Sequence, residues 1–495
     1  MTPDAVTRGR LSIVDELERD MAPEVADAFV QLVTQYLAGT RDVTQRVTTS
    51  ASPEVLARRF AEPLPRRGRT VEEIVARLRT DVIADSNHLY HPRYVGHQVS
   101  APLPAAVWTD SLISALNQSV AVFEMSPVGT VLETQVIRWM CELAGYGPGS
   151  GGTLTSGGTE ATQTSILAAR AAVLPQAWVE GVGSNPPVVV CGEHAHYAVT
   201  RAVGTLGLGV QHTVWVPSRD HRMDVAALRD TLNRLAAEGR KVMAVVATAG
   251  STATGSFDDL EAIGTLCESR GLWLHVDAAH GASALLSARH RHRMAGLAFA
   301  QSIAWDPHKM MLLPLAAGAV LVRDERRLER AFTQQAPYLF HGAAGDTERR
   351  WDQGVRSAQC SRRADVLKLW VALQRYGADG IGALYDQLCD VARGMYDEIA
   401  RTPRLEAQHE PSCNILCFRW VGDGTHDGAT LDAVNRTLRD RYNASGHGWI
   451  TATDLGGRRV LRVTIMNPRT TVEHCREILH ALVATGDAIS TGEAS

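Results

Sequence analysis

The alternation of short apolar runs with helical segments between residues 100 and 330 constrains the fold of this chain most strongly. The runs are rich in β-branched residues, and helices are predicted between them over 159–173, 224–237 and 258–269. The apolar runs cover residues 187–191, 213–216, 242–247, 272–276, 302–304 and 319–322. Continuous apolar strands are typical of a sheet buried on both faces, which predicts an α/β fold with a mainly parallel central sheet. Right-handed crossovers then place the carboxyl ends of the strands at one edge, where ligands bind.

The segment before residue 85 has a helical pattern. Apolar residues recur with helical spacing between Val25 and Leu37. Thr70 followed by Glu73 is a capping-box pattern, which predicts the start of a second helix that extends to Val82. Because both helices have wide apolar faces, we expect an N-terminal helical arm that packs against something outside itself.

A third pattern begins after about residue 375. Strands are predicted over 414–418 and 460–464, and helices over 428–438 and 471–484. Two strands with two helices fit a small α+β domain. The expected division is therefore an arm (1–85), a large α/β domain (86–375) and a small C-terminal domain (376–495).

Charge and cysteine content exclude several classes of protein. The 50 Lys and Arg residues nearly balance the 54 Asp and Glu residues, giving a net charge of −4, so we expect no nucleic-acid partner. No apolar run approaches the roughly 20 residues of a membrane-spanning helix, and the first residues lack a secretory-signal pattern, so we expect no membrane association. The eight cysteines form neither a disulfide framework nor a zinc motif, so no metal is expected and a cytoplasmic location is predicted.

Three polar clusters lie where predicted strands end or helices begin. The run 152–161 (GTLTSGGTEA) precedes a helix and follows a glycine-rich stretch, 145–152, that we expect to form a loop. Small residues before the free N–H groups of a helix suit a phosphate, although a simple turn has the same composition. Asp277 ends an apolar strand, and Lys309 lies between Trp305 and Met310, where partial burial would lower its pKa and favour Schiff-base chemistry.

Each cluster alone has an ordinary structural explanation, but the combination does not. A phosphate cradle, a carboxylate at a strand end and a lysine in apolar surroundings are what a pyridoxal 5′-phosphate site requires. The helix start holds the phosphate, the carboxylate holds the pyridine nitrogen and the lysine bonds to the aldehyde. The sequence therefore predicts a pyridoxal 5′-phosphate enzyme.

The chain also resembles the group II pyridoxal-phosphate amino-acid decarboxylases of fold type I, which include aromatic amino-acid, glutamate and 2,4-diaminobutyrate decarboxylases. The resemblance runs from about His91 to Thr471. The segments that carry it are 91–97 (HPRYVGH), 155–160 (TSGGTE), 193–196 (EHAH), 246–248 (VAT), 275–279 (HVDAA) and 306–309 (DPHK). It implies the transferase-like fold of that class and a small-molecule amino-acid substrate. It also implies a homodimer with active sites at the interface.

Position by position, the resemblance implies roles for single residues. Lys309 is the expected Schiff-base lysine, and Asp277 the partner of the pyridine nitrogen. His196 is expected to stack on the pyridine ring and, with His308 beside the lysine, to hold the substrate carboxylate. The other cofactor contacts are expected at Gly158 and Thr159 for the phosphate, Asp306 beside it, and Thr248 and Ala279 at the ring.

The sequence departs from the family pattern in one loop. Many members have a mobile-loop tyrosine that protonates the α-carbon after carbon dioxide leaves, and its loss diverts relatives toward aldehydes. Residues 339–361 contain no tyrosine; Trp351 and Gln353 lie near that place, and Tyr338 and Tyr376 lie outside it. His341 or His308 could supply the proton instead, and we expect the amine to dominate.

The substrate is expected to meet a polar segment. His97, Gln98 and Ser100 lie where aromatic amino-acid decarboxylases have apolar side chains, and the run with Asn117 to Ser119 is similar to bacterial 2,4-diaminobutyrate decarboxylases. We therefore expect a small polar or cationic amino acid, with 2,4-diaminobutyrate as the first candidate. Three alternatives stay open: an oxidative, aldehyde-forming enzyme, a decarboxylase of aromatic or acidic amino acids, and a catalytically silent scaffold of the same fold.

Overall fold

The structure is a computed structural model that describes residues 13–333, 336, 338–340 and 349–492. Its centre is a seven-stranded sheet in the order β1-β9-β8-β7-β6-β2-β3. The strands in that order are Gly151–Thr155, Gly318–Val322, Ser302–Trp305, Trp273–Asp277, Val242–Thr248, Val188–Gly192 and Thr213–Val216. Only β9 runs antiparallel to its neighbours β1 and β8, and the other adjacent pairs are parallel. The mainly parallel α/β sheet predicted from the apolar runs is confirmed.

Strand β1 was not expected, because the glycine-rich stretch before it predicted a loop. Glycine has a low strand propensity, so the sequence carries no strand signal there. Pairing with β9 determines the structure instead. A Cβ at Gly152 would collide with the carbonyl oxygen of Val320, so only glycine allows the two backbones to approach this closely.

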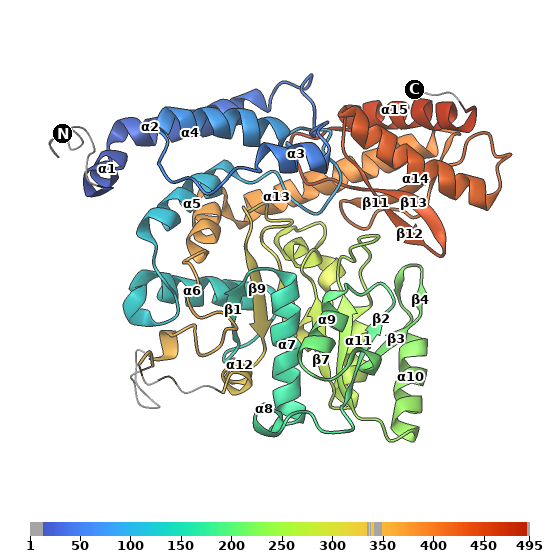
Figure 1. Cartoon of the computed structure of the whole chain (residues 1–495). Coiled ribbons are helices and arrows are strands. Elements are labelled where there is room, and N and C mark those ends of the chain that lie inside the picture. Colours follow the sequence, from blue (N-terminus) through green and yellow to red (C-terminus); the bar gives the residue numbers. More distant parts are fainter. Residues whose placement is uncertain (1–12, 334–335, 337, 341–348, 493–495) are drawn as a thin grey trace.

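Helices cover both faces of the sheet (Figure 1). Helices α7 (Gly158–Val173) and α9 (Ala198–Thr205) pack on one face with Val189 and Val246. The other face, with Val190 and Val245, packs against α6 (Pro127–Leu143), α10 (Val225–Ala237), α11 (Leu260–Ser269) and α13 (Val366–Ala400). Neighbouring residues of one strand thus enter opposite cores, as a doubly covered sheet requires.

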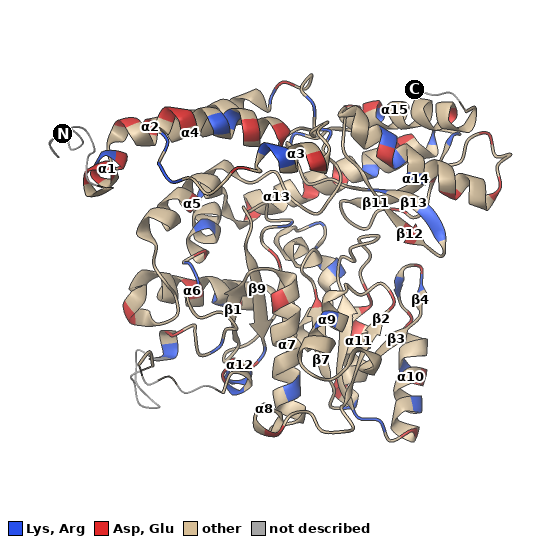
Figure 2. Cartoon of the chain, viewed as in Figure 1, with Lys and Arg blue, Asp and Glu red and all other residues tan. Residues whose placement is uncertain are grey.

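The first part of the chain is helical, as predicted. It contains α1 (Ile13–Asp20), α2 (Pro23–Gly39), α3 (Pro53–Arg59) and α4 (Val71–Arg77), followed by α5 (Pro104–Leu116). The capping box of Thr70 and Glu73 is present at the start of α4, and a π turn, Leu78–Val82, continues that helix. Acidic and basic residues lie side by side here (Figure 2), and Arg77 forms ion pairs with Glu62 at 2.9 Å and with Asp81 at 3.0 Å.

The C-terminal part is a four-stranded antiparallel sheet with two helices. The strand order is β10-β11-β13-β12, with bounds Leu405–Ala407, Ile415–Trp420, Arg458–Thr464 and Thr451–Leu455. Helices α14 (Gly428–Ser445) and α15 (Val472–Ser490) pack on it. The two predicted strands are β11 and β13, whereas β10 and β12 were not anticipated. The expected boundary at residue 375 lies within α13, next to a helix break at Gly377.

The remaining short elements complete the chain. They are the helix α8 (Ala177–Glu180), the hairpin β4 (Ser218–Arg219) with β5 (Arg222–Met223), and α12 (Arg326–Ala331). Short 3-10 helices form at Ile83–Asp85, Phe123–Met125, Val210–His212, Gly281–Leu286, Arg291–Met294, Leu297–Phe299 and Arg349–Trp351. Among the helices of the described residues, none is both long and apolar enough to cross a bilayer.

Candidate active site

One cavity of about 350 Å³ lies at the carboxyl ends of the strands β6, β7 and β8, beside the start of α7. It brings together all nine residues expected to bind the cofactor or act in catalysis. These are Gly158, Thr159, His196, Thr248, Asp277, Ala279, Asp306, His308 and Lys309. The remaining lining residues are Ser156, Gly157, Gly250, Thr252, His280 and Leu315. The cavity therefore lies at the sheet edge where an α/β fold binds its ligands.

Gly157 and Gly158, which lack side chains, form a cradle at the start of α7. A Cβ at Gly158 would lie 2.8 Å from the Ala279 Cβ and 3.0 Å from Asp306 Oδ2. The first turn of α7 has free N–H groups, as every helix start does, and these suit an anion. Glu160 fixes the turn before the helix, because its Oε2 accepts hydrogen bonds from the backbone N and the Oγ of Ser156, each at 2.7 Å.

Lys309 lies on the floor of the cavity beside a buried carboxylate. Its Nζ is 3.0 Å from Asp306 Oδ2, and the Asp306 side chain is 2% exposed. Asp306 Oδ1 has no hydrogen-bond partner among the described residues. The sequence contains only three lysines, and the other two, Lys241 and Lys368, lie outside this cavity. Lys309 is therefore the one amine that can react with a bound aldehyde here.

His308 has a defined tautomer. The backbone N–H of Ala317 donates to His308 Nδ1 at 3.0 Å, so the neutral ring has its proton on Nε2. That nitrogen is 3.5 Å from Asp306 Oδ2. Burial lowers the pKa of His308, which favours the neutral ring. His308 thus holds a proton at the atom nearest the Lys309–Asp306 pair.

Asp277 ends β7 and is nearly buried, at 9% exposure. Its Oδ1 accepts a hydrogen bond from the backbone N–H of Ala279 at 3.2 Å. Thr248 pairs with it on β6, and Asp258 Oδ2 accepts from the Thr248 backbone N–H at 2.7 Å. The carboxylate is therefore held at the base of the cavity, where a protonated ring nitrogen would neutralise its charge.

His196 stands on another wall of the cavity, before α9. Its Nδ1 accepts a hydrogen bond from the Ala198 backbone N–H at 3.2 Å, which fixes the imidazole plane. Burial lowers the pKa of His196, and the nearby Asp277 raises it to a lesser extent. A neutral, fixed imidazole is suited to stacking on a flat ring.

The expected substrate residues do not line this cavity within the single chain. Ser100 is buried behind it, with its Oγ donating to the carbonyl oxygen of His308 at 3.3 Å. His97 is exposed, and Gln98 Nε2 is buried without a hydrogen-bond partner in the described residues. Two residues outside the expected set were missed by the sequence analysis: His280, which lines the cavity, and Arg462, whose positive charge acts on His280. The position of His280 next to Ala279 was a usable signal, whereas Arg462 lies in an otherwise ordinary strand pattern.

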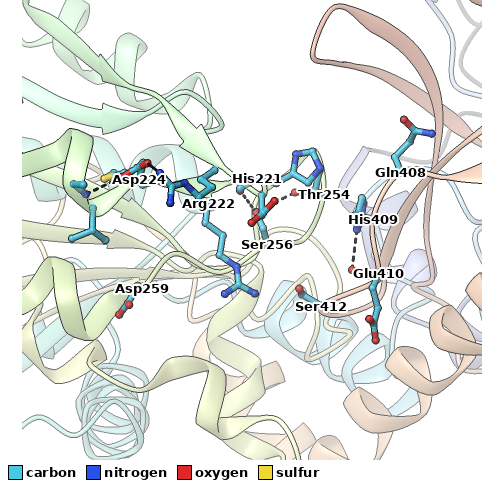
Figure 3. Close-up of a pocket in the computed structure, with 15 residues that line it drawn as sticks. His221, Arg222, Asp224, Thr254, Ser256, Asp259, Gln408, His409, Glu410 and Ser412 are labelled. Atoms are coloured by element: carbon cyan, nitrogen blue, oxygen red, sulfur yellow. Dashed lines mark hydrogen bonds and ion pairs between the residues drawn. The ribbon is translucent and has the colours of Figure 1, made fainter.

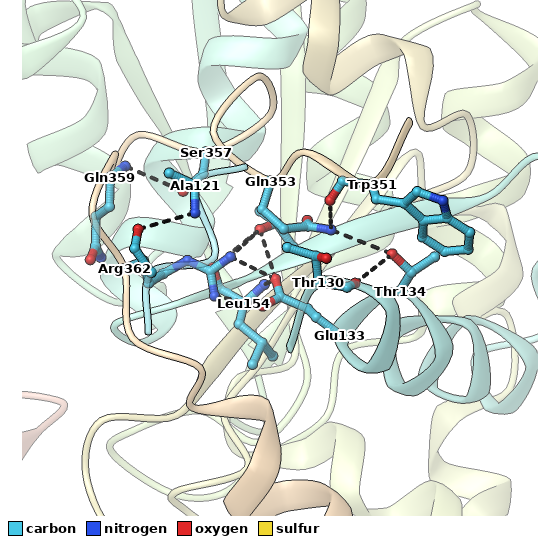
Figure 4. Close-up of polar contacts among 12 residues, drawn as sticks. Ala121, Thr130, Glu133, Thr134, Leu154, Trp351, Gln353, Ser357, Gln359 and Arg362 are labelled. Carbon is cyan, nitrogen blue, oxygen red and sulfur yellow. Dashed lines mark hydrogen bonds and ion pairs between the residues drawn. The ribbon is translucent and has the colours of Figure 1, made fainter. Parts of the chain in front are cut away.

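A buried ion pair anchors the segment that follows the tyrosine-free loop (Figure 4). Arg362 donates from Nη1 to Glu133 Oε2 at 2.8 Å and from Nη2 to Oε1 at 2.7 Å. Gln359, near the end of that loop, donates from Nε2 to Glu160 Oε2 at 2.6 Å, which links the loop to the start of α7. Of the loop residues considered above, Gln353 is buried and donates from Nε2 to the Trp351 carbonyl at 3.3 Å, and His341 lies outside the described residues.

A second cavity, of about 790 Å³, lies between the β4–β5 hairpin and residues 408–412 of the small domain (Figure 3). It contains none of the expected site residues. His409, on its wall, uses both ring nitrogens: Nε2 accepts from the Cys417 backbone N–H at 3.2 Å, and Nδ1 donates to the Glu410 carbonyl at 3.1 Å. The chemistry indicated by the sequence is confined to the smaller cavity.

The smaller cavity fits pyridoxal 5′-phosphate. The side-chain-free cradle suits the phosphate, the strand-end carboxylate suits a protonated pyridine nitrogen, and Lys309 suits the aldehyde. The unpartnered Asp306 Oδ1 is a further polar atom that a bound group can satisfy. Each feature comes from a different element, so the fit does not follow from one local motif.

Comparisons with known proteins agree with this chemistry. Residues 53–421 match the family model described as the pyridoxal-dependent decarboxylase conserved domain. The chain is 31% identical to L-2,4-diaminobutyrate decarboxylase of Acinetobacter baumannii, covering 91% of each protein, and 33% identical to human cysteine sulfinic acid decarboxylase, covering 96% of each. The crystal structure of mouse CSAD superposes with a TM-score of 0.87 at 29% identity, over 94% of this chain and 99% of the other.

Family membership follows from the extent of these matches. The family model spans most of the chain, and the two relatives align along nearly its whole length. The predicted cofactor and reaction class are confirmed. The chain belongs to the pyridoxal-dependent decarboxylase family, and it is an amino-acid carboxy-lyase that uses pyridoxal 5′-phosphate.

Proposed function

We propose that the enzyme decarboxylates a small L-amino acid with a polar or cationic side chain, first of all 2,4-diaminobutyrate, giving 1,3-diaminopropane and carbon dioxide. The proposal rests on the polar segment 97–100 beside the cavity, where Ser100 contacts the backbone of His308 and Gln98 has a buried, unpartnered Nε2. The similarity to a 2,4-diaminobutyrate decarboxylase over 91% of the chain supports it.

Within this proposal, the cavity residues have separate tasks. Gly158 and Thr159 hold the phosphate, with Asp306 beside it, and Asp277 keeps the ring nitrogen protonated. Thr248, Ala279 and His196 enclose the ring, and Lys309 holds the aldehyde. When bound, pyridoxal 5′-phosphate accepts the electron pair released as carbon dioxide leaves. His196 and His308 orient the substrate carboxylate perpendicular to the ring, the geometry in which that bond breaks most readily.

The product depends on which group protonates the α-carbon. His308 holds its proton on Nε2, faces the Lys309–Asp306 pair and lies in the cavity wall. We assign the proton transfer to His308, so the amine is the main product. If dioxygen reaches the α-carbon first, the products are an aldehyde, ammonia and hydrogen peroxide.

A second substrate class is favoured by Arg462. This residue is 8% exposed, its Nε has no hydrogen-bond partner, and it forms no ion pair with a carboxylate in the described part of the chain. Burial lowers its pKa, which shows that the charge is costly without an anion. An acidic side chain such as that of cysteine sulfinate would supply one.

One experiment separates these possibilities. The purified enzyme is incubated with single amino acids, and amine, aldehyde, ammonia and peroxide are measured by mass analysis and coupled assays. The proposal expects 1,3-diaminopropane without peroxide from 2,4-diaminobutyrate. Faster turnover of cysteine sulfinate or aspartate would favour the acidic class, a preference for tyrosine or tryptophan would contradict the polar pocket, and equimolar aldehyde, ammonia and peroxide would establish the oxidative reaction.

We also propose that the enzyme is cytoplasmic and forms a homodimer. All eight cysteines are free thiols, which fits the reducing cytoplasm. The apolar residues exposed on the arm favour a homodimer. Leu315 lines the cavity and is 59% exposed, which supports an active site at the interface of two copies.

A further inference from the structure

His280 is a buried residue in the wall of the cavity, next to the proposed cofactor contact Ala279. It follows Ala279 after β7, is 2% exposed and lines the cavity. Its Nε2 lies 2.7 Å from Asn414 Oδ1. Its Nδ1 has no hydrogen-bond partner among the described residues. A buried imidazole is thus bound on one side only.

The contacts of Asn414 determine the tautomer of His280. Asn414 Nδ2 donates to the carbonyl oxygen of Ile465 at 2.8 Å, so the amide oxygen is the atom that faces His280. An amide oxygen only accepts, so His280 carries its proton on Nε2 and a lone pair on Nδ1. Burial, together with the positive charges of Lys309 and Arg462, lowers the pKa of His280 to about 3. The ring is therefore a neutral acceptor at physiological pH.

Hydrogen bonds link the partner of His280 to the polar segment 97–100. The backbone of Asn414 accepts a hydrogen bond from Ile465 N–H at 2.9 Å, and the next residue, Met466, accepts one from Ala101 N–H at 3.2 Å. Residue 101 adjoins the polar segment 97–100, in which Ser100 contacts His308. A short hydrogen-bonded path thus connects His280 to the segment expected to meet the substrate.

We propose that His280 Nδ1 accepts a hydrogen bond from a donor on the substrate side chain, an ammonium or a hydroxyl, and that Asn414 positions it for this contact. The inference rests on the proposed function and specifies its substrate class. A fixed lone pair on a buried wall residue favours donors. It disfavours carboxylates, because two acceptors facing each other leave both without a proton.

The first test replaces His280 by Phe, which keeps a ring but removes the acceptor. Three side chains of similar size are compared: 2,4-diaminobutyrate with an ammonium, homoserine with a hydroxyl and norvaline with a methyl group. We expect kcat/KM to fall about 10- to 100-fold for diaminobutyrate and about 3- to 10-fold for homoserine, with little change for norvaline. His447→Phe, at an exposed histidine, is the control, and cofactor absorbance must stay at the wild-type level in both variants.

The second test changes the tautomer without changing the ring. In Asn414→Asp, a carboxylate faces Nε2 and favours the imidazolium, so Nδ1 becomes a donor. The substrate preference of this variant, measured as the ratio of kcat/KM values, should then move from diaminobutyrate toward aspartate. Nitrogen NMR of histidine-labelled holoenzyme should find His280 Nδ1 unprotonated in the wild type and protonated in Asn414→Asp.

The outcomes distinguish this inference from the proposed function. The wild type alone tests the function, which fails if diaminobutyrate is not decarboxylated. The ratio of kcat/KM for homoserine to kcat/KM for norvaline tests the role of His280, whichever amino acid is the natural substrate. Equal losses for all three substrates in His280→Phe, a loss of cofactor absorbance, or a protonated Nδ1 in the wild type would each overturn the role of His280.

Discussion

Asp306 is the residue on which the two reactive side chains of the cavity converge. Its buried Oδ2 lies 3.0 Å from Lys309 Nζ and 3.5 Å from His308 Nε2. The carboxylate thus holds the Lys309 side chain in the cavity, where a cofactor aldehyde would bond to Nζ. In the proposed function, Asp277 has the complementary task at the other end of the ring. Two carboxylates in one cavity therefore serve two different cations.

Lys309 should be the only residue that binds the cofactor covalently. Borohydride reduction of the holoenzyme followed by peptide mapping should find the label in the peptide containing Lys309. The other two lysines are internal controls, because Lys368 is buried against Asp365 at 3.2 Å and Lys241 lies at the far end of the sheet, before β6. A label on either of them would contradict the assignment.

Asp277→Asn should keep the fold and the cofactor but reduce kcat at least ~10²-fold, because a neutral amide cannot hold the protonated ring nitrogen. The measurement is steady-state turnover together with the cofactor absorbance spectrum. Asp454→Asn, at an exposed aspartate of β12, is the matched control and should have wild-type turnover. Near-normal turnover of Asp277→Asn with bound cofactor would refute the role.

At the scale of elements, the sequence predicted those helices and strands that have a clear apolar or capping pattern. The strands buried on both faces appear as continuous apolar runs, and the capping box of α4 appears as Thr70 and Glu73. Strand β1 begins with two glycines, and β12 (Thr451–Leu455) carries exposed and polar residues, so tertiary pairing rather than local propensity determines both. The cofactor cavity was predictable because its residues follow strands. His280 was signalled only by its position next to Ala279, since its partner Asn414 is 134 residues away in the sequence, and Arg462 lies in an ordinary strand pattern.

The start of α7 offers a test of the cradle as an element. Gly158→Ala places a methyl group against Ala279 and Asp306, so we expect the dissociation constant of pyridoxal 5′-phosphate to rise at least about 10-fold, with the helix retained. Absorbance titration of the apoenzyme measures the affinity, and circular dichroism measures the fold. Gly147→Ala is the control, because a Cβ there meets no atom within 4 Å. Unchanged affinity in Gly158→Ala would mean that the phosphate binds elsewhere.

At the scale of the whole molecule, the N-terminal arm exposes large apolar side chains to solvent. Helix α1 and the turn after it expose Ile13 at 67%, Leu17 at 59% and Met21 at 79%, although neighbouring α2 and α4 pack on each other. Exposed apolar residues gathered on one element mark an interaction site. In Figure 1 the arm lies above α5 and α13, and the end of the arm that contains α1 is the one farther from the small domain. A second copy of the chain is the partner that the family resemblance predicts for this surface.

The final prediction tests that partner. Leu17→Glu combined with Met21→Glu should convert a dimer of the 53.6 kDa chain into monomers, because each buried apolar side chain contributes roughly 1.5–3 kcal/mol and is lost in both copies. Light scattering over a range of concentrations measures the mass, and turnover at the same concentrations should fall with the dimer fraction if the interface completes the site. Val179→Glu, which replaces an apolar residue 82% exposed on α8, should remain dimeric and active. A wild-type chain that is folded, active and monomeric would reject the interface, and an active monomeric double variant would separate assembly from catalysis.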